Sequence, residues 1–290
     1  KIGSSIINSN DIKVIFSSAP PYTVHLIAMK LSKKYSIPWV ADFRDPWVDR
    51  FYNFENKRMW LTKVVDSSLE KRVINNASVL TTVSRTISGY YEKPFSVIHN
   101  GYDEEDFNLV NKKENNTMVI SYIGTMTKSQ NTPYFFDAVH QLNNDGNKYQ
   151  IDLIGSVHPD IINDVNSKGY DYFIKIKPYI PHKEAIRKMC ESDFLLLVIP
   201  NTKKNMGIVT GKLFEYIRSM RKIIMIGPPN SDAEKIIRKT NSGFCFDYNE
   251  KENFKEFLIK KHDKESSNFK EYSREYLTGL LANIFNKINK

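Results

Sequence analysis

Short apolar runs rich in branched side chains alternate along this chain with longer segments of helical periodicity. Such alternation is typical of βαβ units, which build a parallel sheet covered by helices. The first unit shows it clearly, because a strand expected at 12–16 precedes a helix at 23–35 and a second strand at 39–43. The pattern therefore predicts an α/β chain with Rossmann-like, doubly wound parallel sheets.

A polar stretch divides the expected strands into two series. Residues 103–117 combine charges and amides with few apolar positions, which is typical of an interdomain linker. We expect a first domain at 1–108, a second at 109–268, and a last helical segment at 269–290. The remaining strands are expected at 78–82, 95–99, 118–123, 150–155, 173–177, 194–199, 223–226 and 243–246. The first domain has fewer strands than a nucleotide-binding half usually has and no glycine-rich first turn, so we expect part of it to lie upstream of Lys1.

Composition excludes several classes of protein. The two cysteines, Cys190 and Cys245, lie far apart, which excludes a disulfide framework and a cysteine zinc site and fits a reducing compartment. The longest apolar runs reach about a third of the roughly 20 residues that cross a bilayer. The net charge is +9, but no recognition-helix or RNA-binding signature supports nucleic acid as a partner. We expect a cytoplasmic protein whose basic charge suits an anionic membrane face.

Ligands of doubly wound sheets bind at the carboxyl ends of the strands. The segments with unusual residues at such ends are 17–21, 42–47, 98–103, 124–128 and 207–216. In the last of these, Thr210 and Gly211 predict a helix start, with Lys212 and Glu215 at neighbouring positions of the first turn. The positive helix end and Lys212 favour a diphosphate there. The Glu215 carboxylate either accepts hydrogen bonds from the hydroxyls of a ribose or interacts with the dipole of its own helix.

Three charged residues, Asp42, Arg44 and Asp45, follow the strand expected at 39–43. Charges are costly to bury unless they are paired, so they favour a cleft or an ion pair. Two interpretations stay open: Arg44 contacts a ligand while Asp42 or Asp45 orients it through a bidentate pair, or an Arg–Asp pair only fixes the loop. We find no carboxylate or histidine set with metal-ligand spacing, and we expect no metal site.

Four of these segments occur in the order and approximate spacing of a known family. They are the Ser-Ala-Pro-Pro turn at 18–21, Ala41–Trp47, Ile98–Asp103 with Phe107, and Gly211–Tyr216 before Pro228. The chain resembles the GT-B fold glycosyltransferases of the large retaining, family 4-like group that builds bacterial surface polysaccharides such as capsule or O-antigen. The resemblance covers essentially the whole chain. It implies two Rossmann-like domains facing a cleft, with the last helix packed on the first domain.

The resemblance implies a function and a donor site. The expected enzyme moves a sugar from a UDP- or GDP-linked donor to a lipid-linked or polysaccharide acceptor, with retention of configuration and without a metal or other cofactor. It would be a hexosyltransferase peripheral to the inner membrane face. Glu215 would hold the ribose, and the turn containing Gly124, Thr125 and Lys128 would hold the donor phosphates.

The sequence departs from that family at two places. Many members carry a second glutamate eight residues before the first, where this chain has Gly207, so the backbone around Gly207 and Ile208 would have to contact the sugar. Relatives also carry one or two basic residues after the strand expected at 118–123, where they hold the donor phosphates, whereas the nearest here is Lys128. Arg44 falls where relatives often have a cleft histidine, which makes it a candidate catalytic residue with Asp42 and Asp45.

Two rival functions remain. A nucleotide-sugar epimerase shares the two-domain architecture, but it needs a set of acid and base residues that we do not find in this sequence. A non-catalytic or truncated nucleotide-binding subunit would need no such set.

Overall fold

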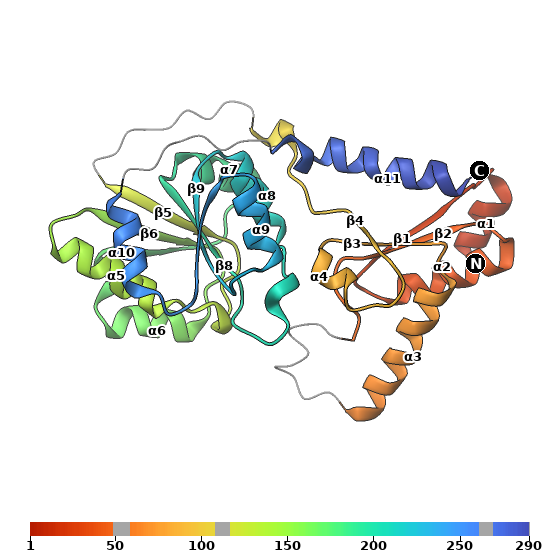
Figure 1. Ribbon diagram of the computed structural model, residues 1–290, viewed down its shortest axis with the longest axis horizontal. Helices are drawn as coiled ribbons and strands as arrows, with labels where there is room; N and C mark the ends of the chain where they lie inside the picture. Colours follow the sequence, from red (N-terminus) through yellow and green to blue (C-terminus); the bar gives the residue numbers. More distant parts are fainter. Residues whose placement is uncertain (49–58, 108–116, 261–268, 290) are drawn as a thin grey trace. The chain divides into compact units, whose positions relative to one another are not determined.

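The computed structural model describes residues 1–48, 59–107, 117–260 and 269–289. The chain divides into two compact units (Figure 1). Unit 1 comprises Lys1–Asn100 with Arg274–Lys290, and unit 2 comprises Gly101–Ser273. Both units are parallel α/β structures, as the alternation predicts.

Unit 1 contains a four-stranded parallel sheet. Its strands are β1 (Ile15–Ala19), β2 (Trp39–Phe43), β3 (Val79–Thr82) and β4 (Ser96–Val97), in the order β1-β2-β3-β4. Its helices are α1 (Ile2–Ser9), α2 (Thr23–Tyr35), α3 (Trp60–Asn76), α4 (Arg85–Ser88) and α11 (Arg274–Ile288). Every residue of β2 is buried, which is typical of a parallel strand covered on both faces. Helix α11 packs on β1, where the rings of Phe285 and Phe16 lie 5.7 Å apart.

Unit 2 contains a six-stranded parallel sheet. Its strands are β5 (Met118–Ile123), β6 (Tyr149–Ile154), β7 (Ile174–Lys177), β8 (Phe194–Val198), β9 (Lys222–Ile226) and β10 (Gly243–Phe246). Their order is β10-β9-β8-β5-β6-β7, so the winding reverses between β5 and β8. This reversal is the switch point at which doubly wound sheets bind ligands.

Helices cover both faces of the unit 2 sheet (Figure 1). They are α5 (Pro133–Asn144), α6 (Pro159–Ser167), α7 (His182–Glu191), α8 (Gly211–Arg218), α9 (Asp232–Lys239) and α10 (Lys251–Ile259). Short 3-10 turns lie at η2 (Glu104–Phe107), η3 (Lys128–Gln130), η4 (Tyr170–Tyr172), η5 (Asn205–Gly207) and η6 (Lys270–Tyr272). No helix in the described part of the chain is both long enough and apolar enough to span a bilayer.

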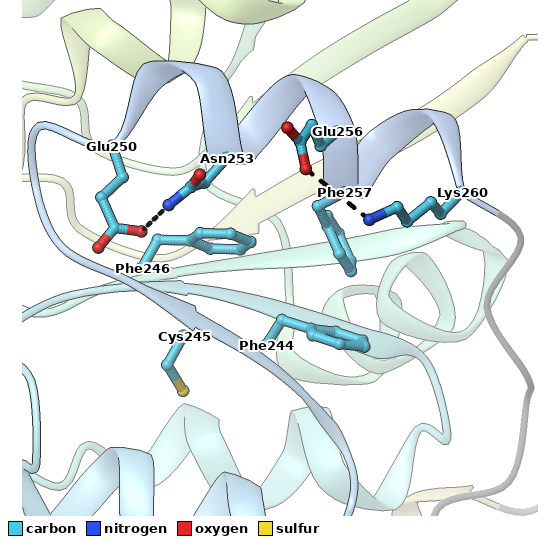
Figure 2. A pocket seen from close by; sticks show the side chains of 8 residues that line it. All are labelled: Phe244, Cys245, Phe246, Glu250, Asn253, Glu256, Phe257 and Lys260. Carbon is cyan, nitrogen blue, oxygen red and sulfur yellow. Dashed lines mark hydrogen bonds and ion pairs between the residues drawn. The ribbon is translucent and has the colours of Figure 1, made fainter.

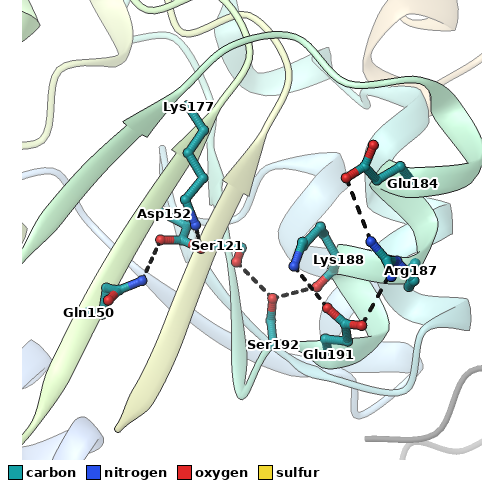
Figure 3. A network of polar contacts seen from close by, with 9 residues as sticks. All are labelled: Ser121, Gln150, Asp152, Lys177, Glu184, Arg187, Lys188, Glu191 and Ser192. Atoms are coloured by element: carbon teal, nitrogen blue, oxygen red, sulfur yellow. Dashed lines mark hydrogen bonds and ion pairs between the residues drawn. The ribbon is translucent and has the colours of Figure 1, made fainter. Parts of the chain in front are cut away.

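Polar contacts join the sheet of unit 2 to the end of α7 and join β6 to β7 (Figure 3). The Ser192 hydroxyl donates to Ser121 of β5 at 2.7 Å, and Lys177 pairs with the buried Asp152 across β6 and β7. Since buried polar groups are stable only when paired, the Ser192 contact fixes the start of β8 against β5, and the Lys177 pair fixes β7 against β6.

Several strands have the bounds that the sequence predicts, including β2, β5 and β10, and so does α2. The first strand was predicted wrongly, because β1 begins at Ile15 and continues through two serines. Ser17 is buried there and accepts a 2.8 Å hydrogen bond from the indole N–H of Trp39. The Ser17 hydroxyl is therefore paired with a residue of β2. A search for apolar runs does not find a strand that contains such a buried polar residue.

Candidate functional site

The candidate site lies at the end of β5, where the first turn of α8 approaches it. Thr210 is the N-cap of α8, but its side chain accepts no capping hydrogen bond. Its buried hydroxyl has no hydrogen-bond partner within the described ranges. The Tyr216 hydroxyl accepts from the Ile123 N–H at 3.0 Å, which holds α8 against β5. The helix start predicted at Thr210 and Gly211 thus lies at the switch point.

Lys212 extends from this first turn across the end of β5. Its Nζ donates to the Tyr122 hydroxyl at 3.1 Å and lies 4.1 Å from the centroid of the same ring. Burial lowers the pKa of Lys212 to about 8, although the nearby Glu215 carboxylate opposes that shift. The side chain is therefore a cation held in a poorly hydrated place, which an anionic ligand would stabilise.

Two glycines make room for this arrangement. Gly124 has φ +122°, and a Cβ there would come within 3.1 Å of the Lys212 Nζ. Gly155, which follows β6 with φ +124°, packs so closely that a Cβ would lie 2.5 Å from the Gly124 carbonyl oxygen. Glycine is required at both positions, since other residues rarely adopt this φ. The turns after β5 and β6 are thus packed closely against each other and against Lys212.

A glutamine that the sequence analysis did not single out holds the turn after β5. The Gln130 side-chain amide donates to the Tyr122 hydroxyl at 3.2 Å and to the Val198 carbonyl at the end of β8 at 2.8 Å. The Tyr122 hydroxyl in turn donates to the Thr125 carbonyl at 2.6 Å. The capping-box pattern of Thr127 and Gln130 was the available sequence signal. These contacts connect the two strands that flank the switch point.

Glu215 lies one turn into α8, beside the start of α7. Its Oε1 is 3.0 Å from Nε2 of His182, whose Nδ1 is 3.8 Å from a carboxylate oxygen of Asp106. The sequence analysis did not single out His182, and the structure adds this contact. The histidine restricts the rotamers of Glu215 and leaves part of its carboxylate accessible, since the side chain is 17% exposed.

Three other expected donor-binding residues, Lys128, Gly207 and Ile208, have contacts of their own. Lys128 forms an exposed 2.8 Å ion pair with Asp160, so a phosphate would have to compete with that carboxylate. Gly207 ends η5 and is buried, with Ile208 directly after it. The Asn205 side chain donates to the Pro200 carbonyl at 3.0 Å and thereby fixes the backbone before Gly207.

In unit 1, Asp42 and Arg44 contact each other. The buried Asp42 carboxylate accepts 2.7 Å hydrogen bonds from Ser18 and Thr81 and lies 3.5 Å from Arg44 Nη1. Arg44 also donates to the Asn100 side chain and to the Ile98 carbonyl. This geometry fits the interpretation in which the pair fixes the loop.

Asp45 follows in the same loop. Its backbone carbonyl accepts from the Tyr22 hydroxyl at 2.8 Å. The buried Glu70 of α3 accepts from the Trp47 N–H at 3.0 Å and from the Tyr91 hydroxyl at 2.7 Å, which anchors the end of the loop.

Comparisons with known proteins identify the architecture. No protein-family model matches the chain, and no curated protein matches it in sequence. Sucrose-phosphate synthase from Thermosynechococcus elongatus matches in structure with a TM-score of 0.73 and 10% identity, over 99% of this chain and 76% of that one. A glycosyltransferase from Rickettsia africae matches with a TM-score of 0.69 and 15% identity, over 100% of this chain and 80% of that one.

A third match is a protein from Listeria monocytogenes assigned as a UDP-N-acetylglucosamine 2-epimerase. Its TM-score is 0.60 at 11% identity, over 98% of this chain and 76% of that one. The chain has the GT-B fold. Its four-stranded and six-stranded parallel sheets are the two α/β domains of that architecture. Because a GT-B fold carries different reactions, the reaction must be argued from the site.

A surface pocket of about 430 Å³ lies elsewhere in unit 2, between β10 and α10 (Figure 2). Phe244 and Phe257 supply its apolar surface, and Glu250, Glu256 and Lys260 supply its charges. It opens at the edge strand of the sheet, whereas GT-B ligand chemistry is expected at the switch point. Within the described ranges, no three carboxylate, histidine or cysteine side chains are grouped to hold a metal ion.

Proposed function

We propose that this chain is a glycosyltransferase that transfers a sugar from a nucleoside-diphosphate sugar to an acceptor. The observation that carries the proposal is the position of Lys212, whose side chain extends from the start of α8 and places its Nζ beside Gly124 at the switch point. A helix N-terminus with an added cation favours a diphosphate, and the glycine turn lets the backbone approach it.

The same groups would act on the leaving group. As the sugar departs, negative charge grows on the nucleoside diphosphate, and the first turn of α8 and Lys212 stabilise that charge without reorganising. Glu215, oriented by His182, accepts hydrogen bonds from the ribose hydroxyls. The turn at Gly124, Thr125 and Lys128 and the backbone at Gly207 and Ile208 complete the proposed donor site.

The finer parts of the proposal rest on the resemblance to the family 4-like group. They are retention of configuration, a reaction that needs no metal, a UDP- or GDP-linked hexose as donor, and a lipid-linked or polysaccharide acceptor of capsule or O-antigen synthesis. Arg44, Asp42 and Asp45 are proposed on the acceptor side. The proposed location is the cytoplasm, at the inner membrane face. The UDP-sugar in the name of the Listeria neighbour favours UDP.

Calorimetric titration of UDP and of GDP tests the donor site. We expect one nucleotide to bind, and Glu215→Ala to weaken it about tenfold or more, as expected when hydrogen bonds to a charged group are lost. Glu184→Ala is the matched control, because Glu184 is an acidic residue of unit 2 whose contact is an exposed pair with Arg187. Absence of binding by both nucleotides would refute the proposed donor site.

The main rival is the epimerase that the Listeria neighbour suggests. Incubation with UDP-N-acetylglucosamine in the absence of acceptor separates the two, since an epimerase interconverts the sugar nucleotide and a transferase leaves it epimerically unchanged. Nucleotide binding with neither epimerisation of the sugar nucleotide nor sugar transfer to an acceptor would instead favour a non-catalytic subunit.

A further inference from the structure

The first two turns of α3 expose large apolar side chains. Trp60 is 70% exposed, and Leu61, Val64 and Val65 are each more than half exposed, as is Met59 directly before the helix. Single exposed apolar residues are common on protein surfaces, but a contiguous group of this size marks an interaction site.

These side chains occupy the outward side of the helix. The buried residues of α3 are Glu70, Val73 and Ile74, which face unit 1. Successive residues of a helix are rotated by about 100° around its axis, so Trp60, Val64, Leu61 and Val65 lie side by side on an arc of about 140°. The centre of this arc lies about 160° around the axis from the centre of the buried residues. Figure 1 shows this end of α3 extending away from the sheet of its own unit. The apolar arc therefore faces away from the unit 1 core.

The same outward arc becomes basic toward the end of the helix. Lys71 and Arg72 are exposed and, at the same helical spacing, fall within the arc. The two acidic residues of α3, Asp66 and Glu70, lie on the opposite side. The outward face thus carries apolar side chains over its first turns and positive charge over its later turns, with no negative charge.

We propose that this outward face of α3 binds the surface of an anionic phospholipid membrane. Trp60 and its apolar neighbours would enter the boundary between head groups and acyl chains, where tryptophan is enriched. Lys71 and Arg72 would contact the lipid phosphates, which attract lysine and arginine near the surface.

The charge pattern favours a membrane over a protein partner. Protein interface cores are depleted in lysine, and a second copy of this chain would bring the same uncompensated positive charges to the contact. The proposal concerns unit 1 and rests on the membrane-face location proposed above, to which it assigns a surface; vesicle binding tests it separately from the nucleotide binding of unit 2.

Cosedimentation of the full chain with vesicles tests the proposal. We expect binding to phosphatidylcholine vesicles that contain phosphatidylglycerol and much weaker binding to phosphatidylcholine alone. Leu61→Glu with Val65→Glu should lower the partition coefficient about tenfold or more, because it removes apolar burial and adds negative charge. Ile259→Glu is the control, since Ile259 is 63% exposed but lies on α10 in unit 2.

Two further readouts identify the face. Lys71→Gln with Arg72→Gln should lower binding about tenfold only where phosphatidylglycerol is present. The tryptophan emission should shift to the blue on binding, and Trp60 is the reporter because Trp39 and Trp47 are already buried.

Unchanged cosedimentation of the Leu61→Glu, Val65→Glu variant would overturn the proposal, as would a wild-type chain that ignores anionic vesicles. So would a lipid-free dimer that the same substitutions dissociate, because the face would then be a contact between copies. Circular dichroism of each variant confirms that the exposed substitutions leave the fold intact.

Discussion

His25 is a buried histidine whose charge state limits stability in acid. It is fully buried on α2, its Nδ1 lies 2.8 Å from the Ser17 hydroxyl, and burial lowers its pKa from 6.5 to about 4 against the opposing influence of Asp42. Below pH 6.5 the unfolded chain binds a proton that the folded chain does not, so stability falls as the pH drops toward 4. The full loss is about 3 kcal/mol.

Denaturant unfolding between pH 4 and pH 7 measures this dependence. We expect His25→Gln to flatten the decline in the free energy of unfolding, because the group that titrates is gone. His158→Gln is the control, since His158 is a partly exposed N-cap residue of α6. Equal slopes for wild type and His25→Gln would show that other groups cause the acid sensitivity.

We expect the proposed nucleotide binding to depend on pH at the alkaline side through Lys212. With a pKa of about 8, the amine is about half protonated at that pH in the unliganded protein, and a bound diphosphate favours the ammonium form. Binding should therefore take up a proton near pH 8 and weaken as the pH rises further. Calorimetry in buffers of different ionisation enthalpy measures the uptake, and Lys212→Met should abolish it. Proton uptake that persists in Lys212→Met would assign it to another group.

At the scale of elements, the turn after β5 depends on one hydroxyl. Tyr122→Phe removes the oxygen that accepts from Lys212 and Gln130, and we expect nucleotide affinity to fall about fivefold, the equivalent of one hydrogen bond. The alkaline limb of the binding profile should also move to lower pH, because the ammonium loses an acceptor.

Tyr149→Phe is the matched control for this change. The Tyr149 hydroxyl donates to the Leu258 carbonyl, so its loss affects unit 2 without touching Lys212. A merely structural role for Tyr122 would lower the stability of both variants and leave the pH profile of binding unchanged. An unmoved profile in Tyr122→Phe would therefore contradict the positioning role.

The sequence predicts elements and local pairs better than contacts between distant residues. Strands β2 and β5 are predictable because each is an apolar run with clear ends, and Lys212 and Glu215 are predictable neighbours because they share one helical turn. Gln130 and His182 were not predictable as site residues, since each meets its partner through tertiary packing. The end of β1 was predicted too early because Ser17 and Ser18 resemble a turn, although Ser17 is buried in the strand.

At the scale of the whole molecule, the polar composition and the packing place the boundary between the two units at different residues. The stretch at 103–117 predicts a boundary at 108, but the compact units divide between Asn100 and Gly101. The reason is that the Tyr102 N–H donates to the Tyr272 carbonyl and Glu104 pairs with Arg218 of α8. These contacts hold the start of unit 2 in place. Polar composition alone cannot distinguish such an ordered segment from a linker.

Unit 2 is one continuous stretch, and this makes a last prediction possible. All the proposed donor-binding residues lie within Gly101–Ser273, together with the contacts of Tyr102 and Glu104. We expect residues 101–273, expressed alone, to unfold cooperatively and to bind nucleotide within about threefold of the full chain, since an untouched site keeps its binding free energy. Glu215→Ala in the same fragment should lose binding as it does in the full chain. A fragment that folds but binds about tenfold more weakly would show that unit 1 contributes directly to the donor site.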